Sequence, residues 1–222
     1  PVFILSGGKR CGERAGMAPK AAVFDIGRVL INWDPEGFYD RVIGAEARAR
    51  LFAEVPLTAT NISIDNGSPW RETIFDLADA HPGWSAEIRL WHDRWIEMAS
   101  PAIDHSVRLM RALRARGIPV IALTNFGAES FAYARTRYDF FNEFDGAVVS
   151  GELKAMKPDP AIYVEVERRS GLTGPDLIFT DDNPDNIAAA LARGWKAHLF
   201  TDPQGWADRL LAEGLLTAGE AA

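Results

Sequence analysis

The sequence is poor in cysteine and has no long hydrophobic run. Cys11 is the only cysteine among the 222 residues, so no disulfide can form within the chain. A chain without disulfides is typical of a reducing compartment, and we expect a cytoplasmic protein. The longest early apolar run, Val2–Leu5, is far too short for a signal peptide or a membrane span. We therefore expect no membrane partner.

The sequence also has fewer basic than acidic residues. The 24 Lys and Arg residues are outnumbered by 31 Asp and Glu residues, which gives a net charge of −7. Nucleic-acid-binding proteins normally present a basic face, so this balance argues against a nucleic-acid partner. A small anionic substrate is compatible with it wherever a local cation offsets the negative field.

Several common catalytic signatures are missing. The four histidines, His81, His92, His105 and His198, are scattered without the spacing of metal ligands. The chain contains no Gly-x-Ser-x-Gly, Gly-x-Gly-x-x-Gly or Walker sequence. Serine-hydrolase and nucleotide-binding interpretations therefore lack support.

Residues 1–16 are rich in glycine and charge and precede Met17. We interpret them either as an extension upstream of a natural start at Met17 or as a loosely held N-terminal arm. Both interpretations place residues 1–16 outside the folded core.

Five short apolar runs are continuous rather than alternating in polarity. Strands buried on both faces have this pattern, which indicates a parallel sheet covered by helices. The runs are Ala21–Phe24, Val120–Leu123, Ala147–Val149, Leu177–Phe179 and Ala197–Phe200. Residues 104–117, 159–171 and 184–194 have helical patterns, each ended by a glycine. The alternation of strand and helix predicts a doubly wound α/β fold.

The strand signal disappears between Asp34 and about Pro101, where tryptophans recur at helical spacing. We interpret residues 35–101 as a helical domain inserted into an α/β core that comprises residues 17–34 and 102–222. The tryptophans of this insert are expected in its own core or in contacts with the α/β core. Asp34 is expected in a turn before the insert, although it is also a candidate for a catalytic acid.

Polar side chains follow four of the five predicted strands. Ligands of open parallel sheets bind beyond the carboxyl ends of the strands, so these groups are expected on one rim. They are Asp25 after the first strand, Thr124 and Asn125 after the second, Lys154 and Lys157 after the third, and Asp181, Asp182 and Asp185 after the fourth. Asp185 and Asn186 are expected to cap the helix near Pro184 or to support the acidic cluster.

Asp25, Asp181 and Asp182 would lie close together if their strands are neighbours. Uncompensated carboxylates at short range repel and raise each other's pKa, and a hard divalent cation relieves this. Mg²⁺ prefers oxygen ligands and keeps waters and a phosphate oxygen in its shell. Lys157 would then complete the charge balance as a partner of phosphate. The Thr124 hydroxyl and the Asn125 backbone N–H are candidates for binding phosphoryl oxygens.

The order of these strand-end motifs resembles that of the haloacid dehalogenase-like hydrolase superfamily. The matching pieces are "VFDIG", "LTN", "KPDP" and "FTDDNPDN", between residues 23 and 186. The resemblance implies a small helical cap domain at the place of the insert and an aspartyl-enzyme mechanism. The implied site comprises Asp25 as the nucleophile, Asp25, Asp182 and the Gly27 carbonyl as Mg²⁺ ligands, Asp181 as a support or alternative ligand, and Thr124, Asn125 and Lys157 around the phosphate.

Gly27 departs from the pattern of most phosphatases in that superfamily, which carry a second Asp at this position to protonate the leaving group. A branch that resembles bacterial sugar-1-phosphate phosphatases has the same Asp-x-Gly form. We therefore expect a Mg²⁺-dependent phosphoric monoester hydrolase acting on a small phosphorylated metabolite, such as a sugar phosphate, through an aspartyl-phosphate.

Two alternatives stay open. 2-Haloacid dehalogenases also lack the second acid, because a halide leaves without protonation, and they share the position of Tyr163. They typically carry Ser-Ser-Asn where this chain has Asp181, Asp182 and Asn183. The other alternative is a non-catalytic homologue that binds a metal and phosphate. The sequence does not indicate an oligomeric state.

Overall fold

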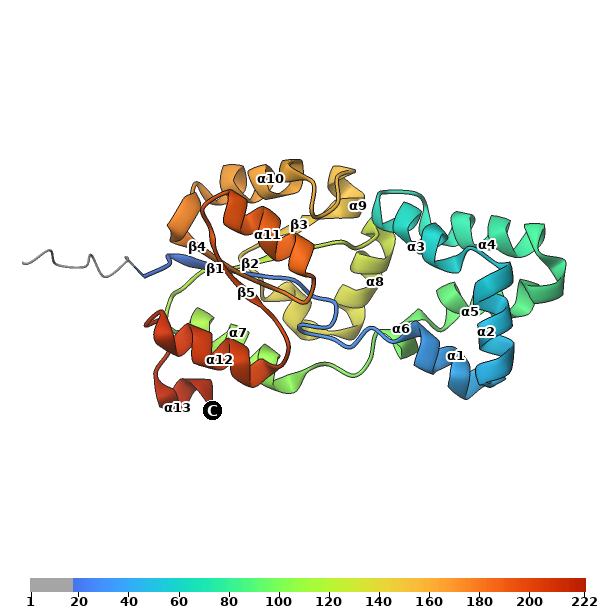
Figure 1. Cartoon of the computed structure of the whole chain (residues 1–222), viewed down its shortest axis with the longest axis horizontal. Coiled ribbons are helices and arrows are strands. Elements are labelled where there is room, and N and C mark those ends of the chain that lie inside the picture. The colour runs from blue at the N-terminus through green and yellow to red at the C-terminus, as the bar shows by residue number, and fades with distance from the viewer. Residues whose placement is uncertain (1–17) are drawn as a thin grey trace, which may run out of the picture.

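Within the described residues, 18–222, the computed structural model contains a five-stranded sheet with helices on both faces (Figure 1). The interpretation of residues 1–16 lies outside this part of the chain. The strands are β1 (Ala21–Phe24), β2 (Val120–Thr124), β3 (Gly146–Val149), β4 (Leu177–Asp181) and β5 (Lys196–Leu199). All neighbouring strands pair in parallel, in the order β3-β2-β1-β4-β5. The predicted doubly wound α/β fold is confirmed.

The strand order places β1 between β2 and β4. The chain fills the sheet from β1 to β3 and then returns to β4 on the other side of β1. Connections therefore leave β1 and β4 in opposite directions, which opens a crevice at the carboxyl ends of these two strands. Phe24 pairs with Thr180, so Asp25 and Asp181 follow at the same level of the sheet.

Successive side chains of β1 face opposite sides of the sheet and enter two separate apolar cores. Ala22 and Phe24 belong to one core, and Ala21 and Val23 to the other. All four side chains are fully buried, which explains the continuous apolar run in the sequence. The covering helices are α7 (Asp104–Ala115), α12 (Pro203–Ala212) and α13 (Ala218–Ala221) on the first face, and α10 (Pro160–Ser170) and α11 (Pro184–Ala192) on the second (Figure 1).

The chain between β1 and α7 forms a group of helices beside the sheet (Figure 1). They are α1 (Pro35–Ile43), α2 (Ala45–Glu54), α3 (Leu57–Asp65), α4 (Trp70–Ala80), η1 (Pro82–Trp84), α5 (Ser85–Asp93) and α6 (Trp95–Met98). We refer to Pro35–Met98 as the helical insert. Asp34 caps α1 by accepting a hydrogen bond of 2.9 Å from the Gly37 N–H, so its carboxylate serves the turn that was expected there.

Four further helices lie in the connections between the strands. They are α8 (Ala128–Arg137), η2 (Asp139–Asn142), α9 (Ser150–Leu153) and η3 (Gly174–Asp176). The helices α8 and α9 lie next to α3 of the insert (Figure 1). Among residues 18–222, no helix has both the length and the apolar character needed to cross a membrane.

Candidate active site

A cavity of about 520 Å³ lies beyond the carboxyl ends of the strands, between the α/β core and the helical insert. The charged groups beside Asp25 come from the core, and the opposite wall combines tryptophans with polar side chains of α3. The core contributes Asp25, Gly27, Asn125, Lys157, Asp182 and Asn186, and the other wall includes Trp33, Asn61, Asp65, Trp91 and Trp95. Thr124 and Asp181 are buried, at 1% and 0% exposure, and Lys154 is exposed in its loop. The predicted strand-end residues thus gather at one edge, but they do not all face the cavity.

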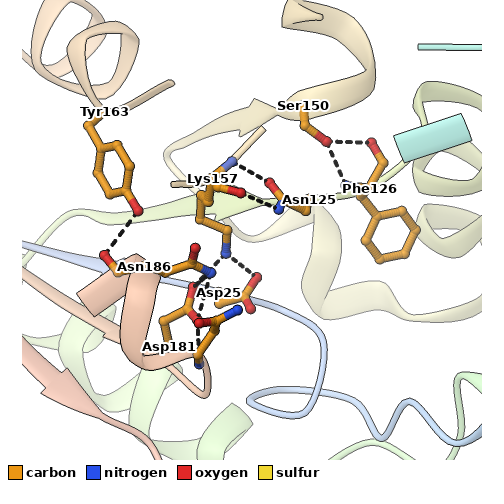
Figure 2. Close-up of polar contacts among 9 residues, drawn as sticks. Asp25, Asn125, Phe126, Ser150, Lys157, Tyr163, Asp181 and Asn186 are labelled. Carbon is orange, nitrogen blue, oxygen red and sulfur yellow. Dashed lines mark hydrogen bonds and ion pairs between the residues drawn. The ribbon is translucent and has the colours of Figure 1, made fainter. Parts of the chain in front are cut away.

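Lys157 joins two of the predicted acids. Its Nζ lies 2.8 Å from Asp25 Oδ1 and 2.6 Å from Asp181 Oδ2 (Figure 2). Burial alone would lower the pKa of Lys157, but the charges of Asp25 and Asp181 outweigh it and raise the pKa. The side chain is therefore a buried ammonium group that faces the cavity.

The side chain of Asn125 holds the backbone of Lys157 in place. Its Oδ1 accepts a hydrogen bond of 2.7 Å from the Lys157 N–H, and its Nδ2 donates one of 3.0 Å to the Lys157 carbonyl (Figure 2). The sequence suggested only a phosphate-binding role for the Asn125 backbone. The two residues are 32 positions apart, and no local pattern signals that their segments pair in this way.

Asp181 is held by donors on all sides, so it acts as a support for Lys157 in this structure. Its oxygens accept hydrogen bonds from Lys157 Nζ, from the Asn183 N–H at 2.8 Å and from Asn186 Nδ2 at 3.0 and 3.1 Å. Asn186 therefore supports the acidic cluster, as expected. The helix cap differs from the expectation. Asn183, the residue directly before α11, caps this helix by accepting a hydrogen bond from the Asp185 N–H.

The carboxylates of Asp25, Asp181 and Asp182 have oxygens that lie within 4.8 Å of one another. Burial raises the pKa of Asp25 to about 7, although Lys157 lowers it and Asp181 raises it further. Burial and the charge of Asp181 also raise the pKa of Asp182, whose carboxylate lies 3.6 Å from Arg28. A hard cation beside Asp25 and Asp182 would relieve this repulsion, and the oxygen donors present fit Mg²⁺.

Gly27 lines the cavity with open space around it. A Cβ atom built at this position would meet no other atom within 4 Å, and the backbone is not in the left-handed region. A larger side chain, such as that of Asp, would therefore fit at position 27 without a steric clash. Tyr163, in contrast, is fully buried, and its hydroxyl donates a hydrogen bond of 3.0 Å to the Asn186 carbonyl, which makes it a core aromatic here (Figure 2).

The wall on the insert side contains residues that the sequence did not single out. Trp91 and Trp95 are buried in the insert, as expected for its core, yet both also line the cavity. Trp91 Nε1 donates a hydrogen bond of 3.0 Å to Asn61 Oδ1, and Asn61 Nδ2 donates one of 2.8 Å to Asp65 Oδ2. The helical spacing of the two tryptophans was visible in the sequence, but which face of their helices would meet the core was not.

Residues 19–194 match the family model of the haloacid dehalogenase-like hydrolases. The chain belongs to this hydrolase family. Its similarity to sesquiterpene phosphatase astK of Aspergillus oryzae is 25% identity over 184 residues, covering 82% of this chain and 90% of that protein. Drimenol cyclase drtB of Aspergillus calidoustus is 23% identical over 189 residues, which cover 82% of this chain and 34% of that longer protein.

Solved structures of this hydrolase family share the fold. The family enzyme BT-2542 of Bacteroides thetaiotaomicron aligns with a TM-score of 0.63 at 19% identity, covering 82% of this chain and 93% of that one. L-2-haloacid dehalogenase of Xanthobacter autotrophicus aligns with a TM-score of 0.59 at 16% identity, covering 91% and 86%. Because phosphatases and dehalogenases share this fold, the reaction has to be argued from the site.

Proposed function

We propose that this hydrolase is a Mg²⁺-dependent phosphoric monoester hydrolase that works through an aspartyl-phosphate. The main support is that one cavity is lined by the Asp25 carboxylate, the Lys157 ammonium and the Asp182 carboxylate. The Aspergillus oryzae relative is named as a phosphatase. One structure of BT-2542 contains magnesium and inorganic phosphate.

In this proposal, Asp25 attacks phosphorus, so that a bond forms to its carboxylate oxygen as the bond to the leaving oxygen breaks. Lys157 and the Asn125 N–H, from two residues that line the cavity, hold the phosphoryl oxygens. Water then attacks phosphorus and releases Asp25 and inorganic phosphate. Asp25, Asp182 and the Gly27 carbonyl would hold Mg²⁺, which when bound would neutralise and orient the phosphoryl group.

The leaving group in our proposal is apolar. The cavity wall that faces the phosphate-binding edge includes Trp33, Trp91, Trp95 and Ile62, which offer apolar contact area to a leaving group beside the polar side chains of α3. The Aspergillus oryzae relative is named for a sesquiterpene substrate, which is also apolar. We therefore place a phosphorylated isoprenoid or alkyl alcohol ahead of a sugar phosphate.

The test is a substrate panel assayed for phosphate or chloride release with Mg²⁺ and with EDTA. The panel contains an isoprenyl monophosphate, decyl phosphate, a hexose 1-phosphate, p-nitrophenyl phosphate and 2-chloropropionate. We expect phosphate release from the apolar esters that disappears in EDTA and in Asp25→Asn. The exposed Asp76→Asn, on α4 of the insert, is the matched control and is expected to keep full activity. Phosphate release that survives Asp25→Asn would refute the mechanism.

The dehalogenase reaction is the second candidate, and the observation that favours it is Gly27, since a halide needs no proton donor. The carboxylates of the buried Asp181 and the half-buried Asp182 count against it, because they would repel the carboxylate of a haloacid. Chloride release from 2-chloropropionate that persists in EDTA would favour this reaction over the phosphatase.

A further inference from the structure

The space around Gly27 raises the question of which group protonates the leaving oxygen. The attacking and leaving oxygens of a phosphoryl transfer lie roughly in line on opposite sides of phosphorus. Asp25 attacks from the core side of the cavity, so the leaving oxygen points toward the helical insert. A proton donor that replaces the missing acid is therefore expected on the insert wall.

The helix α3 presents a polar stripe to the cavity at this point. Thr58, Asn61 and Asp65 follow one another at helical spacings of three and four residues, and all three line the cavity. Asp65 supplies the carboxyl group of this stripe. It stands at the C-terminal end of α3, close to the loop that carries Asn125.

Asp65 is anchored to the core by its backbone as well as by its side chain. Ser150 Oγ donates a hydrogen bond to the Asp65 carbonyl and accepts one of 2.9 Å from the Phe126 N–H. Figure 2 shows the Ser150 and Phe126 part of this link. The Asp65 carboxylate accepts a hydrogen bond of 2.8 Å from the Asn61 amide, and the backbone N–H of Gly127 lowers its pKa. The carboxyl group thus keeps a defined place relative to the strand-end loop of β2.

Glycines make this close approach possible. A Cβ atom at Gly127 would lie 2.7 Å from a side-chain carbon of Ile64, and one at Gly67 would lie 2.9 Å from the Gly151 carbonyl oxygen. Side chains at these positions would push the end of α3 away from the core. The end of α3, which carries Asp65, therefore packs closely against the core.

The surroundings of Asp65 suit a proton donor. Burial raises its pKa to about 7, while the hydrogen bonds from the Gly127 N–H and the Asn61 amide lower it. Both of these donors are neutral. A carboxyl group with a pKa near the working pH is effective both as an acid and as a base.

We propose that Asp65 is the general acid and base of the phosphatase reaction, in place of the acid that Gly27 lacks. This rests on the proposed function. As the bond between phosphorus and the leaving oxygen breaks, the Asp65 carboxyl gives its proton to that oxygen and the alcohol departs. The Asp65 carboxylate then takes a proton from the water that attacks phosphorus. The bond to Asp25 breaks, inorganic phosphate leaves, and Asp65 is again protonated.

The experiment compares Asp65→Asn with the wild type on decyl phosphate and on p-nitrophenyl phosphate, with Mg²⁺. An alkyl alcohol is a poor leaving group that needs a proton, whereas p-nitrophenolate leaves without one. We expect kcat for decyl phosphate to fall by roughly 10²–10⁴-fold and kcat for p-nitrophenyl phosphate to change only a few-fold. The exposed Asp76→Asn is the matched control and is expected to leave both rates unchanged.

A second variant tests the role itself. Gly27→Asp fits the open space at that position. In the Asp65→Asn background it is expected to raise kcat for decyl phosphate at least 10-fold above that of Asp65→Asn alone. Equal losses on both substrates, a change confined to KM, or no loss on decyl phosphate would each overturn the role of Asp65. A wild-type enzyme that releases no phosphate from either ester would instead overturn the proposed function.

Discussion

Two carboxyl groups in the cavity resist ionisation, and their partners differ. Burial raises the pKa of Asp25 and of Asp65 to about 7. Asp25 is in contact with the Lys157 ammonium, which favours its charged form, and a bound cation would favour that form further. The Asp65 carboxylate instead accepts a hydrogen bond from the neutral Asn61 amide. In the proposed function, a cation bound beside Asp25 would separate the two groups further, with Asp25 charged for attack and Asp65 free to exchange its proton.

The raised pKa of Asp65 predicts a pH-dependent gain of stability in Asp65→Asn. The folded-state pKa of about 7 lies above the usual value of 3.8, so the folded protein binds the proton more tightly than the unfolded chain. Below the usual value Asp65 is neutral in both states and contributes no difference. As the pH rises toward about 7, the wild type loses stability that the variant keeps.

We expect the variant's advantage in the free energy of unfolding to grow by on the order of 2 kcal/mol between pH 4.5 and pH 8. Urea unfolding of both proteins in EDTA at the two pH values measures it. Asp76→Asn, exposed on α4, should show no such pH-dependent difference. An Asp65→Asn advantage that is the same at both pH values would contradict the raised pKa.

At the scale of elements, the three central strands β1, β2 and β4 could be predicted because each one is buried on both faces. The run Ala21–Phe24 has the same bounds in the sequence and in the structure. The fourth strand is longer than predicted and ends at Asp181, because this polar side chain is buried and fully hydrogen-bonded at the strand end. Apolar periodicity cannot signal a strand residue of that kind.

The pairing of distant elements could not be predicted in the same way. Asn125 hydrogen-bonds to the Lys157 backbone, and the end of α3 packs against the loop after β2. Both contacts join segments that are far apart in the chain. Sequence patterns report which face of a helix is apolar, but not which other element it meets. The strand-end motifs could therefore locate Asp25 and Lys157, whereas Asp65 required the three-dimensional structure.

The close packing of α9 against the loop after β2 predicts a strong effect of Gly151→Ala. The new Cβ would lie 2.5 Å from the Ala128 nitrogen and 2.8 Å from the Phe126 carbonyl oxygen, both backbone atoms that cannot move independently. We expect a loss of about 1–3 kcal/mol in the free energy of unfolding, as overpacking usually causes. Phosphatase activity should fall as well, because the displaced loop carries Asn125.

The measurement is urea unfolding together with kcat for p-nitrophenyl phosphate. Gly146→Ala in β3 is the matched control, since its Cβ would meet nothing within 4 Å. Its free energy of unfolding should stay within about 1 kcal/mol of the wild type. Equal stability and activity of Gly151→Ala and Gly146→Ala would show that α9 and the loop after β2 do not need this close approach.

At the scale of the whole molecule, two parts with different chemistry form one cavity. The sheet supplies charge at the switch point between β1 and β4, where Lys157 offers a local cation within a chain of net charge −7. The helical insert supplies Trp91 and Trp95 together with the polar side chains of α3. In the proposed function, the core would set the reaction and the insert would set which alcohol is accepted.

This division predicts how activity depends on the length of the substrate's alkyl chain. Each methylene group that the insert wall removes from water contributes about 0.8 kcal/mol, so kcat/KM should rise roughly 4-fold per carbon along a series of alkyl phosphates. The rise should level off once the chain fills the cavity of about 520 Å³. Ethyl to dodecyl phosphate, assayed for phosphate release with Mg²⁺, measures the slope.

Ile62→Ser separates this effect from the chemistry at phosphorus. Ile62 lines the cavity but is 52% exposed, so its removal should not disturb the fold. We expect lower kcat/KM for the longer phosphates and an unchanged value for ethyl phosphate, because only longer chains reach this side chain. Val164→Ser on α10, 46% exposed and outside the cavity wall, is the matched control and should leave the whole series unchanged. A flat series in the wild type would show that the insert wall does not bind the leaving group, and the apolar substrate class would then have to be abandoned while the roles of Asp25 and Lys157 stand.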